Sequence, residues 1–563
     1  MMHSKTNNHF TGHDNVNHQM DIASPFHFAP RQNKLPRNAF DMSRHILFSS
    51  PLGMMLPNFV QEVQPGDYME LSAQNFTRTQ PLNTAAFARV REVTDFFFVP
   101  YELLWSGWKS FQGGVKDYNS TLLDPSKFSS VPGIPFGAFF GWNSGSSDLD
   151  SFGFHYWQYA QRLFELLGYP HIFADGSFPT NSADYTKTLL NPFRLLAWNK
   201  IQSDFYRLTD YEDVNPKSYN CDDGFAGDFI FISSDTDHFR YNWTPSIFDM
   251  VKPRYVPFAK DRFTGVKPSR NLGSGINGVG VDTGTQGVVE DSDGNNLPFI
   301  DLGSVHNLDA ADLRNLLAVD RLSRISMLAP KYYAAQIKAH FGVDVSKCDA
   351  CSTRFLGSLD SQLQIGEVLA TAAGSTGSGT TSVPGQISGR GVSSGNGRTI
   401  KFKADADGIV MGVHYFIPQS EYNSDGVDDF NQKLTRYDYY RPEFDNLGLQ
   451  PLRLETMSLH NSLDELNRDA VLGYQARYAE YKSSYDKVCG EFTSHGSLRE
   501  WTIPRSFWAL NTPVDRLRVN PALFNSVVAL QYDGSQATDP FLCHFAFNCK
   551  MVRDMSVNGL PIL

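Results

Sequence analysis

The chain has 563 residues, of which 41% are hydrophobic and 13% aromatic, so it can build a large core. This composition excludes a disordered or fibrous protein. The net charge of -11 and the pI near 5.7 exclude a surface that is basic all round, so any contact with nucleic acid must be local.

Residues 1–40 are rich in His, Asn, Gln and Pro without periodicity, which predicts an N-terminal arm ahead of a single domain over residues 41–563. The arm lacks the apolar stretch of a secretory signal, and no stretch of the chain approaches the roughly 20 apolar residues that span a bilayer. The six cysteines are sparse for this length, as in a reducing cytosol. We therefore expect no export, no membrane insertion and no structural disulfide.

The first strand signals follow the arm. Met69, Leu71 and Ala73 alternate with polar residues, which is the period-2 pattern of a strand with one buried face. The run at 94–99 ends in three phenylalanines and a valine before Pro100, which predicts a strand with apolar neighbours on both faces.

Helical spacing then predicts an insertion at about 150–210. An apolar stripe ends at Gly168, where a C-terminal cap belongs. Asn191 followed by Pro192 predicts a capped start for a second helix.

A second helical insertion is predicted at about 305–345. Leucines and other apolar residues recur at helical spacing until Pro330 interrupts them, and the stripe then resumes up to Gly342.

Two segments, at about 269–303 and 374–397, are rich in Gly with Asp and Asn or Ser and Thr, and we expect both to be long loops. The second contains Gly391-Val392-Ser393-Ser394-Gly395, which matches the nucleophile-elbow string. That motif needs a strand before it and a helix after it. A loop offers neither, so we interpret the match as coincidence.

Strand signals return after the second loop, at 400–403 and 409–417. The clearest strand is the last, in which Phe541, Cys543, Phe545, Phe547 and alternate residues beyond them share one face. Strands at both ends with helices between them predict a mainly β fold. An antiparallel jelly-roll sandwich or barrel with long loop and helical insertions fits this pattern.

Arg398, Lys401 and Lys403, followed by Tyr415, form a basic and aromatic cluster of the kind that neutralises phosphates and stacks bases of single-stranded DNA. A solvated strand face beside a core strand explains the same residues. Both interpretations stay open at this point: the first gives these residues a role in binding DNA, and the second gives them only a structural role.

Cys348 and Cys351 have the spacing of half a zinc site or a redox pair. The sequence has no second pair nearby, so we favour a structural or incidental role over metal or redox chemistry. No catalytic arrangement can be assigned from spacing, and we predict no enzyme activity, metal or cofactor.

Several stretches, in the same order, resemble the major capsid proteins of the Microviridae, and most of all the gokushovirus branch. The resembling stretches are 40–43, 65–67, 91–100, 260–264, 313–343, 355–357, 473–481 and 547–553. Arg262 departs from the tyrosine of the family. The most specific match is 473–481, from which we take six structural or assembly positions. These positions are Gly473, Tyr474, Gln475, Arg477, Tyr478 and Tyr481.

The resemblance implies an eight-stranded jelly roll and a structural protein that self-assembles as sixty copies, in a T=1 icosahedral shell around a circular single-stranded DNA genome. It implies a virion protein assembled in the cytoplasm of a bacterial host. The partners it implies are the genome, minor spike or pilot proteins, small DNA-packaging proteins and a host surface receptor.

The alternative is a secreted glycan-binding or glycan-cleaving β-sandwich, because jelly rolls and aromatic loops also serve lectins. That function would need an export signal. It would also leave the central helices and the 473–481 stretch unexplained.

Overall fold

The computed structural model describes most of the chain. The described residues are 36–113, 130–135, 156–169, 189–225, 229–232, 240–243, 249–250, 252–268, 288–290, 296–298, 310–344, 353–369, 374–375, 381–382, 387–445, 448–457, 471–505, 516–529 and 539–557. The predicted arm up to residue 35, the pair Cys348 and Cys351, and most of the 269–303 segment lie outside these ranges.

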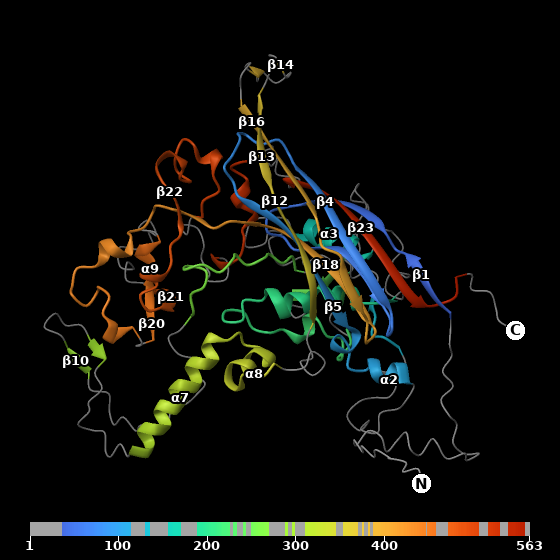
Figure 1. Ribbon diagram of the computed structural model, residues 1–563, viewed down its shortest axis with the longest axis horizontal. Coiled ribbons are helices and arrows are strands. Elements are labelled where there is room, and N and C mark those ends of the chain that lie inside the picture. Colours follow the sequence, from blue (N-terminus) through green and yellow to red (C-terminus); the bar gives the residue numbers. More distant parts are fainter. Residues whose placement is uncertain are drawn as a thin grey trace, which may run out of the picture.

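Two antiparallel sheets pack face to face as a sandwich (Figure 1). The seven strands of the larger sheet are β1 (Arg37–Asp41), β2 (Arg44–Ser50), β4 (Tyr68–Thr79), β13 (Gln364–Leu369), β16 (Ile387–Asn396), β17 (Ile400–Lys403) and β23 (Phe541–Asp554). The four strands of the smaller sheet, in spatial order, are β12 (Arg354–Gln362), β5 (Val90–Pro100), β18 (Gly408–Pro418) and β3 (Leu56–Val63). The expected mainly β, antiparallel architecture is confirmed, and within the described residues the sheets do not close into a barrel.

The two ends of the chain meet in the larger sheet. β23 pairs with β4 on one side and with β1 and β2 on the other. Its residues alternate as predicted, so that Phe541, Cys543, Phe545 and Phe547 are buried. Strands from the two ends of the chain therefore pair at one edge of the larger sheet.

Aromatic rings fill the space between the sheets. Phe547 of β23 lies 5.0 Å from Phe59 of β3 and 6.3 Å from Phe96 of β5, measured between ring centroids. Phe416 of β18 stacks on Phe541 at 3.9 Å. Such pairs add to the burial of large apolar surfaces, which is the main favourable free energy of folding.

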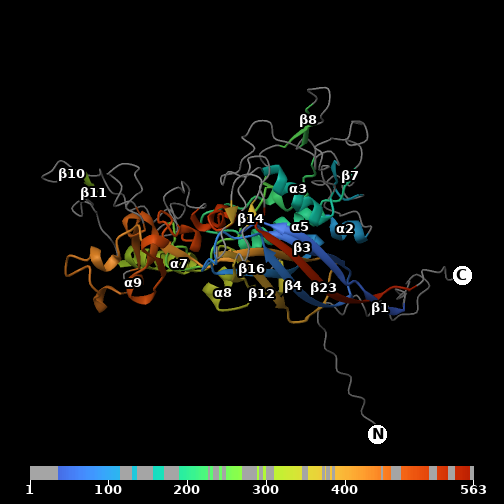
Figure 2. The same cartoon turned by 90° about the horizontal axis from the view of Figure 1, so that it is seen from above.

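Helices cover the outer side of the smaller sheet, where α3 (Tyr156–Leu167) contacts β3, and α5 (Phe193–Ile201) contacts β5 and β18. Figure 2 shows these helices on one side of the strands, together with α2 (Trp108–Gly113). The predicted cap is present, because Asn191 Oδ1 accepts a hydrogen bond from Phe193 N at 2.9 Å. The cover explains why β5 and β18 are buried on both faces.

The second predicted insertion forms a helical hairpin of α7 (Ala310–Leu328) and α8 (Tyr333–Phe341), which ends at Gly342 with a φ of +70°. The hairpin leaves apolar residues such as Tyr333 and Phe341 exposed. Among the described helices, none is long and apolar enough to cross a membrane.

A side lobe lies beside the sandwich (Figure 1). It contains the parallel pair β19 (Glu421–Asn423) and β22 (Asp486–Val488), the antiparallel pair β20 (Leu449–Arg453) and β21 (Val471–Ala476), and the helix α9 (Ala479–Lys482). It has a small core of its own, which includes Phe263, Tyr422 and Leu452. The other short pairs are β6 (Ile134–Pro135) with β7 (Leu189–Leu190), β8 (Phe229–Ile232) with β9 (Arg240–Trp243), β10 (Val288–Glu290) with β11 (Asn296–Pro298), and β14 (Gly374–Ser375) with β15 (Thr381–Ser382).

The prediction of a loop throughout 374–397 is wrong, because β16 pairs with β4 and β13 across much of it. Its glycines permit close packing. A Cβ on Gly391 would lie 2.5 Å from Thr79 Cγ2, and one on Gly395 would lie 2.7 Å from Asn75 Oδ1. Ser393 is buried in mid-strand, so the residue sits on no strand-to-helix turn.

Candidate functional site

The stretch 473–481 passes from β21 into α9 through a strained residue. Tyr478 has a φ of +59° and is the one non-glycine residue with positive φ in the described part of the chain. The conformation is held in place because Tyr478 N donates to Gln450 Oε1 at 2.9 Å and the buried Tyr478 hydroxyl accepts from Arg441 N at 3.3 Å. Strain of this kind costs free energy and persists where the surroundings fix it.

The first half of the stretch docks on the segment around Lys267. Tyr474 and Lys267 exchange backbone hydrogen bonds of 2.7 and 2.8 Å. A Cβ on Gly473 would lie 2.9 Å from the carbonyl oxygen of Lys267, so this approach requires glycine. The buried Gln475 accepts a hydrogen bond from Arg262 Nε at 3.3 Å, so the residue that departs from the family is part of the same contact.

A buried ion pair supports the second half. Lys433 Nζ lies 2.7 Å from Glu480 Oε1, and both side chains are only 6% exposed. Burial raises the pKa of Glu480, but hydrogen bonds, first of all the one from Lys433, outweigh burial and hold that pKa below its usual value. The ammonium also lies 4.6 Å from the ring centroid of Tyr481 and 5.3 Å from that of Phe430, within cation–π range.

Exposed apolar side chains around Lys433, and on the loop that carries it, form a surface that we call the aromatic platform. Its residues are Phe430, Leu434, Tyr437, Tyr439, Tyr440 and Tyr481. Leu434 is 89% exposed and Tyr437 is 70% exposed. At about 150–250 Å² for each large side chain, the exposed fractions add up to on the order of 600 Å² of apolar surface. Patches of this size mark interaction sites on proteins.

Hydrogen bonds to Asp438 brace the loop that carries Leu434 and Tyr437, the two most exposed residues of the platform. The carboxylate of Asp438 accepts hydrogen bonds from the backbone N–H groups of Leu434 and Thr435, at 3.0 and 2.6 Å. The bond with Thr435 is the main reason that the pKa of Asp438 lies below its usual value. A loop backbone held in this way loses little conformational entropy when the loop binds a partner.

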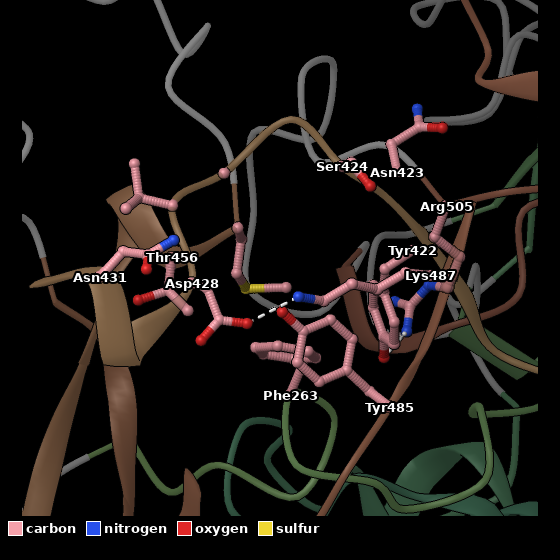
Figure 3. Close-up of a pocket in the computed structure, with 13 residues that line it drawn as sticks. Phe263, Tyr422, Asn423, Ser424, Asp428, Asn431, Thr456, Tyr485, Lys487 and Arg505 are labelled. Carbon is pink, nitrogen blue, oxygen red and sulfur yellow. Dashed lines mark hydrogen bonds and ion pairs between the residues drawn. The ribbon is translucent and has the colours of Figure 1, made fainter. Parts of the chain in front are cut away.

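The side lobe contains a pocket of about 360 Å³ (Figure 3), whose lining includes Asn431, the residue that follows Phe430 of the platform. Phe263 forms part of its wall, with ring centroids 4.7 Å from both Tyr422 and Tyr485. Its charged groups pair with the protein itself, as the 2.7 Å contact between Lys487 and Asp428 shows. The paired charges and packed rings indicate that the pocket helps hold the side lobe together.

The predicted DNA-binding residues are separated by the fold. Arg398, Lys401 and Lys403 are exposed on the side of the larger sheet, and Lys401 lies 3.4 Å from Glu70. Tyr415 belongs to β18 in the smaller sheet, is only 8% exposed, and donates a hydrogen bond to Asp95 Oδ2 at 2.8 Å. These four residues lie close together in the sequence, and the sequence alone does not show that they belong to two different sheets. Tyr415 therefore offers no ring face for stacking here, and DNA contact by the three cations stays a prediction.

A polar cluster spans the sandwich core. Glu92 of β5 accepts hydrogen bonds from Thr77 Oγ1 at 2.6 Å and from Asn75 Nδ2 at 2.7 Å, and its carboxylate lies 3.2 Å from His414 Nε2. Together with Cys543, Glu92 and His414 place metal-ligating atoms within 4.8 Å of one another. Because protein donors already surround the carboxylate, we interpret the cluster as a tie between the sheets.

The aromatic platform was not predicted from the sequence. A signal was available, because 430–440 combines one Phe, one Leu and three Tyr with polar and charged residues and lacks a strand or helix period. Aromatic residues in a polar loop indicate an interface, since a monomer gains little from exposing them.

A rigid sandwich with a lateral platform of exposed aromatic residues is typical of a subunit that binds other proteins through a large surface. Comparison with known proteins identifies the class. The chain matches the family described as "Capsid protein (F protein)" over residues 30–175 and 253–563. It belongs to this family, and is therefore a structural capsid protein and a component of a virion.

Two relatives carry the same printed name. "Capsid protein VP1" of Chlamydia phage 1 is 24% identical over 628 aligned residues, which cover 93% of this chain and 95% of the relative. "Capsid protein VP1" of Bdellovibrio phage phiMH2K is 25% identical over 549 residues, which cover 90% and 92%. The resemblance to the major capsid proteins of the Microviridae is confirmed, and the glycan-binding alternative receives no support from these matches.

Proposed function

We propose that this protein assembles as sixty copies into a T=1 icosahedral shell that packages a circular single-stranded DNA genome. The family assignment and the aromatic platform support the proposal together. A closed shell repeats each contact at its symmetry axes, so modest contacts suffice. The platform, at on the order of 600 Å², approaches the ~800 Å² that each partner contributes to a standard interface.

The proposed subunit consists of an arm at residues 1–40 and one domain at residues 41–563. In this proposal the sandwich is an eight-stranded jelly roll. Strand order supports this assignment. Numbered 1 to 8 along the chain, β2, β3, β4, β5, β12, β16, β18 and β23 lie in the orders 1-8-3-6 and 2-7-4-5. This is the arrangement of two interlocked Greek keys. β1, β13 and β17 are then additions to the larger sheet.

The subunit has a purely structural role and uses no cofactor. Assembly takes place in the cytoplasm of the bacterial host. Further partners are minor spike or pilot proteins, a host surface receptor and small basic proteins, which neutralise most of the genome because the chain itself carries a net charge of -11. Gly473, Tyr474, Gln475, Arg477 and Tyr478 act by holding the platform in position, and Tyr481 forms part of the platform.

The test is assembly of the expressed chain, seen by electron microscopy. We expect uniform closed shells from the natural sequence and only dispersed subunits from the double variant Leu434→Asp/Tyr437→Asp, because carboxylates cannot be buried at a contact without a partner. The matched control, Leu434→Met/Tyr437→Phe, keeps the apolar surface and should form shells. Circular dichroism would establish that all three chains are folded.

Each outcome bears on a different part of the proposal. If the natural chain stays a solitary molecule under all assembly conditions, the shell function is wrong. If the Asp variant forms shells as well as the control does, the platform is not a subunit contact.

A further inference from the structure

The outer face of the larger sheet is basic, although the protein as a whole is acidic. Outward positions follow from the strand register, in which buried and outward residues alternate. The cations at these positions are Arg37, Arg78, Arg390, Lys401, Lys403 and Lys550. The carboxylates are Asp41, Glu70 and Asp554. This face thus carries twice as many cations as carboxylates, in a chain with a net charge of -11.

Flat rings lie among these cations. Phe76 is 40% exposed, and the guanidinium carbon of Arg78 lies 4.9 Å from its ring centroid. His544 is the register partner of Phe76 on the next strand, and it stacks on His45 with ring centroids 5.4 Å apart. Neighbouring strands are about 4.8 Å apart, so these rings form a row across the sheet.

The row and the basic positions lie within reach of one nucleic-acid strand. Glu70, beside Lys401, and Arg78 are eight residues apart on β4, which is about 26 Å of extended chain. Proteins that bind single strands without base readout use this combination of cations that follow the backbone and rings that stack on bases, over about 4–16 nucleotides.

We infer that this face binds single-stranded DNA, with Phe76, His544 and His45 stacking on bases while Arg78, Lys401, Lys403 and Lys550 contact phosphates. The inference rests on the proposed packaging function and identifies the face of the subunit that contacts the packaged DNA. It also gives the subunit an orientation. The α3 and α5 helices pack on the smaller sheet, on the opposite side (Figure 2), so the larger sheet faces the genome and the helical side faces outward.

The experiment measures binding of a labelled oligothymidine to the full-length purified subunit by fluorescence anisotropy, over a range of salt concentrations. The slope of log K against log salt is about -0.7 for each phosphate neutralised on a single strand. The variant Arg78→Gln/Lys401→Gln/Lys403→Gln/Lys550→Gln should therefore lose about 2.8 of that slope. Phe76→Ala should weaken binding roughly 5- to 150-fold, the effect of one lost stacking contact.

The matched control is Lys331→Gln/Lys338→Gln, which removes two exposed cations at the hairpin of α7 and α8 and should leave both affinity and slope unchanged. An unchanged slope in the fourfold variant, or unchanged affinity in Phe76→Ala, overturns the inference.

Shell assembly separates this inference from the proposed function. If the natural chain forms shells, we expect the fourfold variant to form shells with less DNA. Loss of shells with DNA affinity intact would identify the face as a protein contact and refute the inference. If the natural chain forms no shells but binds the oligonucleotide through this face, the shell function fails and the inference stands.

Discussion

Replacing Lys433 by Met tests whether the buried pair supports the aromatic platform. The substitution keeps the length of the side chain and removes its charge. It leaves Glu480, which is 6% exposed, without its 2.7 Å partner. Removing one partner of a buried pair costs about 3–5 kcal/mol, because the remaining charge stays desolvated. We expect the free energy of unfolding of Lys433→Met, from urea denaturation at pH 7, to fall by that amount.

The stability difference between Lys433→Met and the natural chain should also depend on pH. In the natural chain the pKa of Glu480 is below its usual 4.5, so its stabilising effect is present above pH 4.5 and is lost as the pH falls through the lower folded value. In Lys433→Met the hydrogen bond from Lys433 is lost while burial remains, so the pKa of Glu480 rises relative to its pKa in the natural chain. As the pH falls, Glu480 in the folded variant therefore takes up its proton at a higher pH than Glu480 in the folded natural chain. Protonation removes the unpaired buried charge, so the difference in the free energy of unfolding between the two chains should narrow as the pH falls.

The double variant Lys433→Met/Glu480→Gln is the control, because it removes both charges while Gln at 480 can still accept the 2.8 Å hydrogen bond from Gln450. It should recover most of the lost stability, since a buried pair contributes little net free energy compared with neutral groups that pack well. If the single variant is as stable as the natural chain, or the double variant is no more stable than the single one, the buried charge of Glu480 does not depend on Lys433 for its stabilisation.

Three further predictions concern the sandwich. Gly53→Ala should lower the thermal unfolding midpoint, because Gly53 has a φ of +77° and a Cβ there would lie 2.5 Å from Val519 Cγ1. Phe547→Ala should reduce the free energy of unfolding by about 3–5 kcal/mol in urea, since the buried ring bridges both sheets. For Glu92, burial raises the pKa, but hydrogen bonds, first that with His414, hold it below 4.5, so its stabilising effect is complete above pH 4.5 and is lost below it. Glu92→Gln should therefore flatten the acid side of a plot of unfolding midpoint against pH.

The sequence predicted those elements whose side chains face a single apolar environment. β23 was evident because every second residue is buried against the core, and α5 because Asn191 marks its start. β16 was missed for a physical reason. Its glycines accommodate the close approach of β4, whereas the same glycines in isolation predict a loop. Composition alone does not separate a crowded strand from an open turn.

The candidate sites show a similar limit. Lys401 and Tyr415 are 14 positions apart, yet they belong to different sheets and the tyrosine ring is buried. Phe76, the ring that we place with Lys401 on the DNA-binding face, lies more than 300 residues before Lys401 in the sequence. A surface built across strands depends on which strands pair, and pairing of this range has no local signal.

The arrangement of charge follows from the same topology. An acidic chain repels nucleic acid, so a genome-binding face must be separated from the acidic surface by the fold itself. Here β23 and β17 both pair with β4, which places Lys550 and Lys401 on either side of Glu70. The helices cover the other sheet, and the platform lies to the side. One sandwich can thereby present a basic face, a covered face and a lateral contact, and the proposed shell around DNA would use the first for the genome and the last for neighbouring subunits.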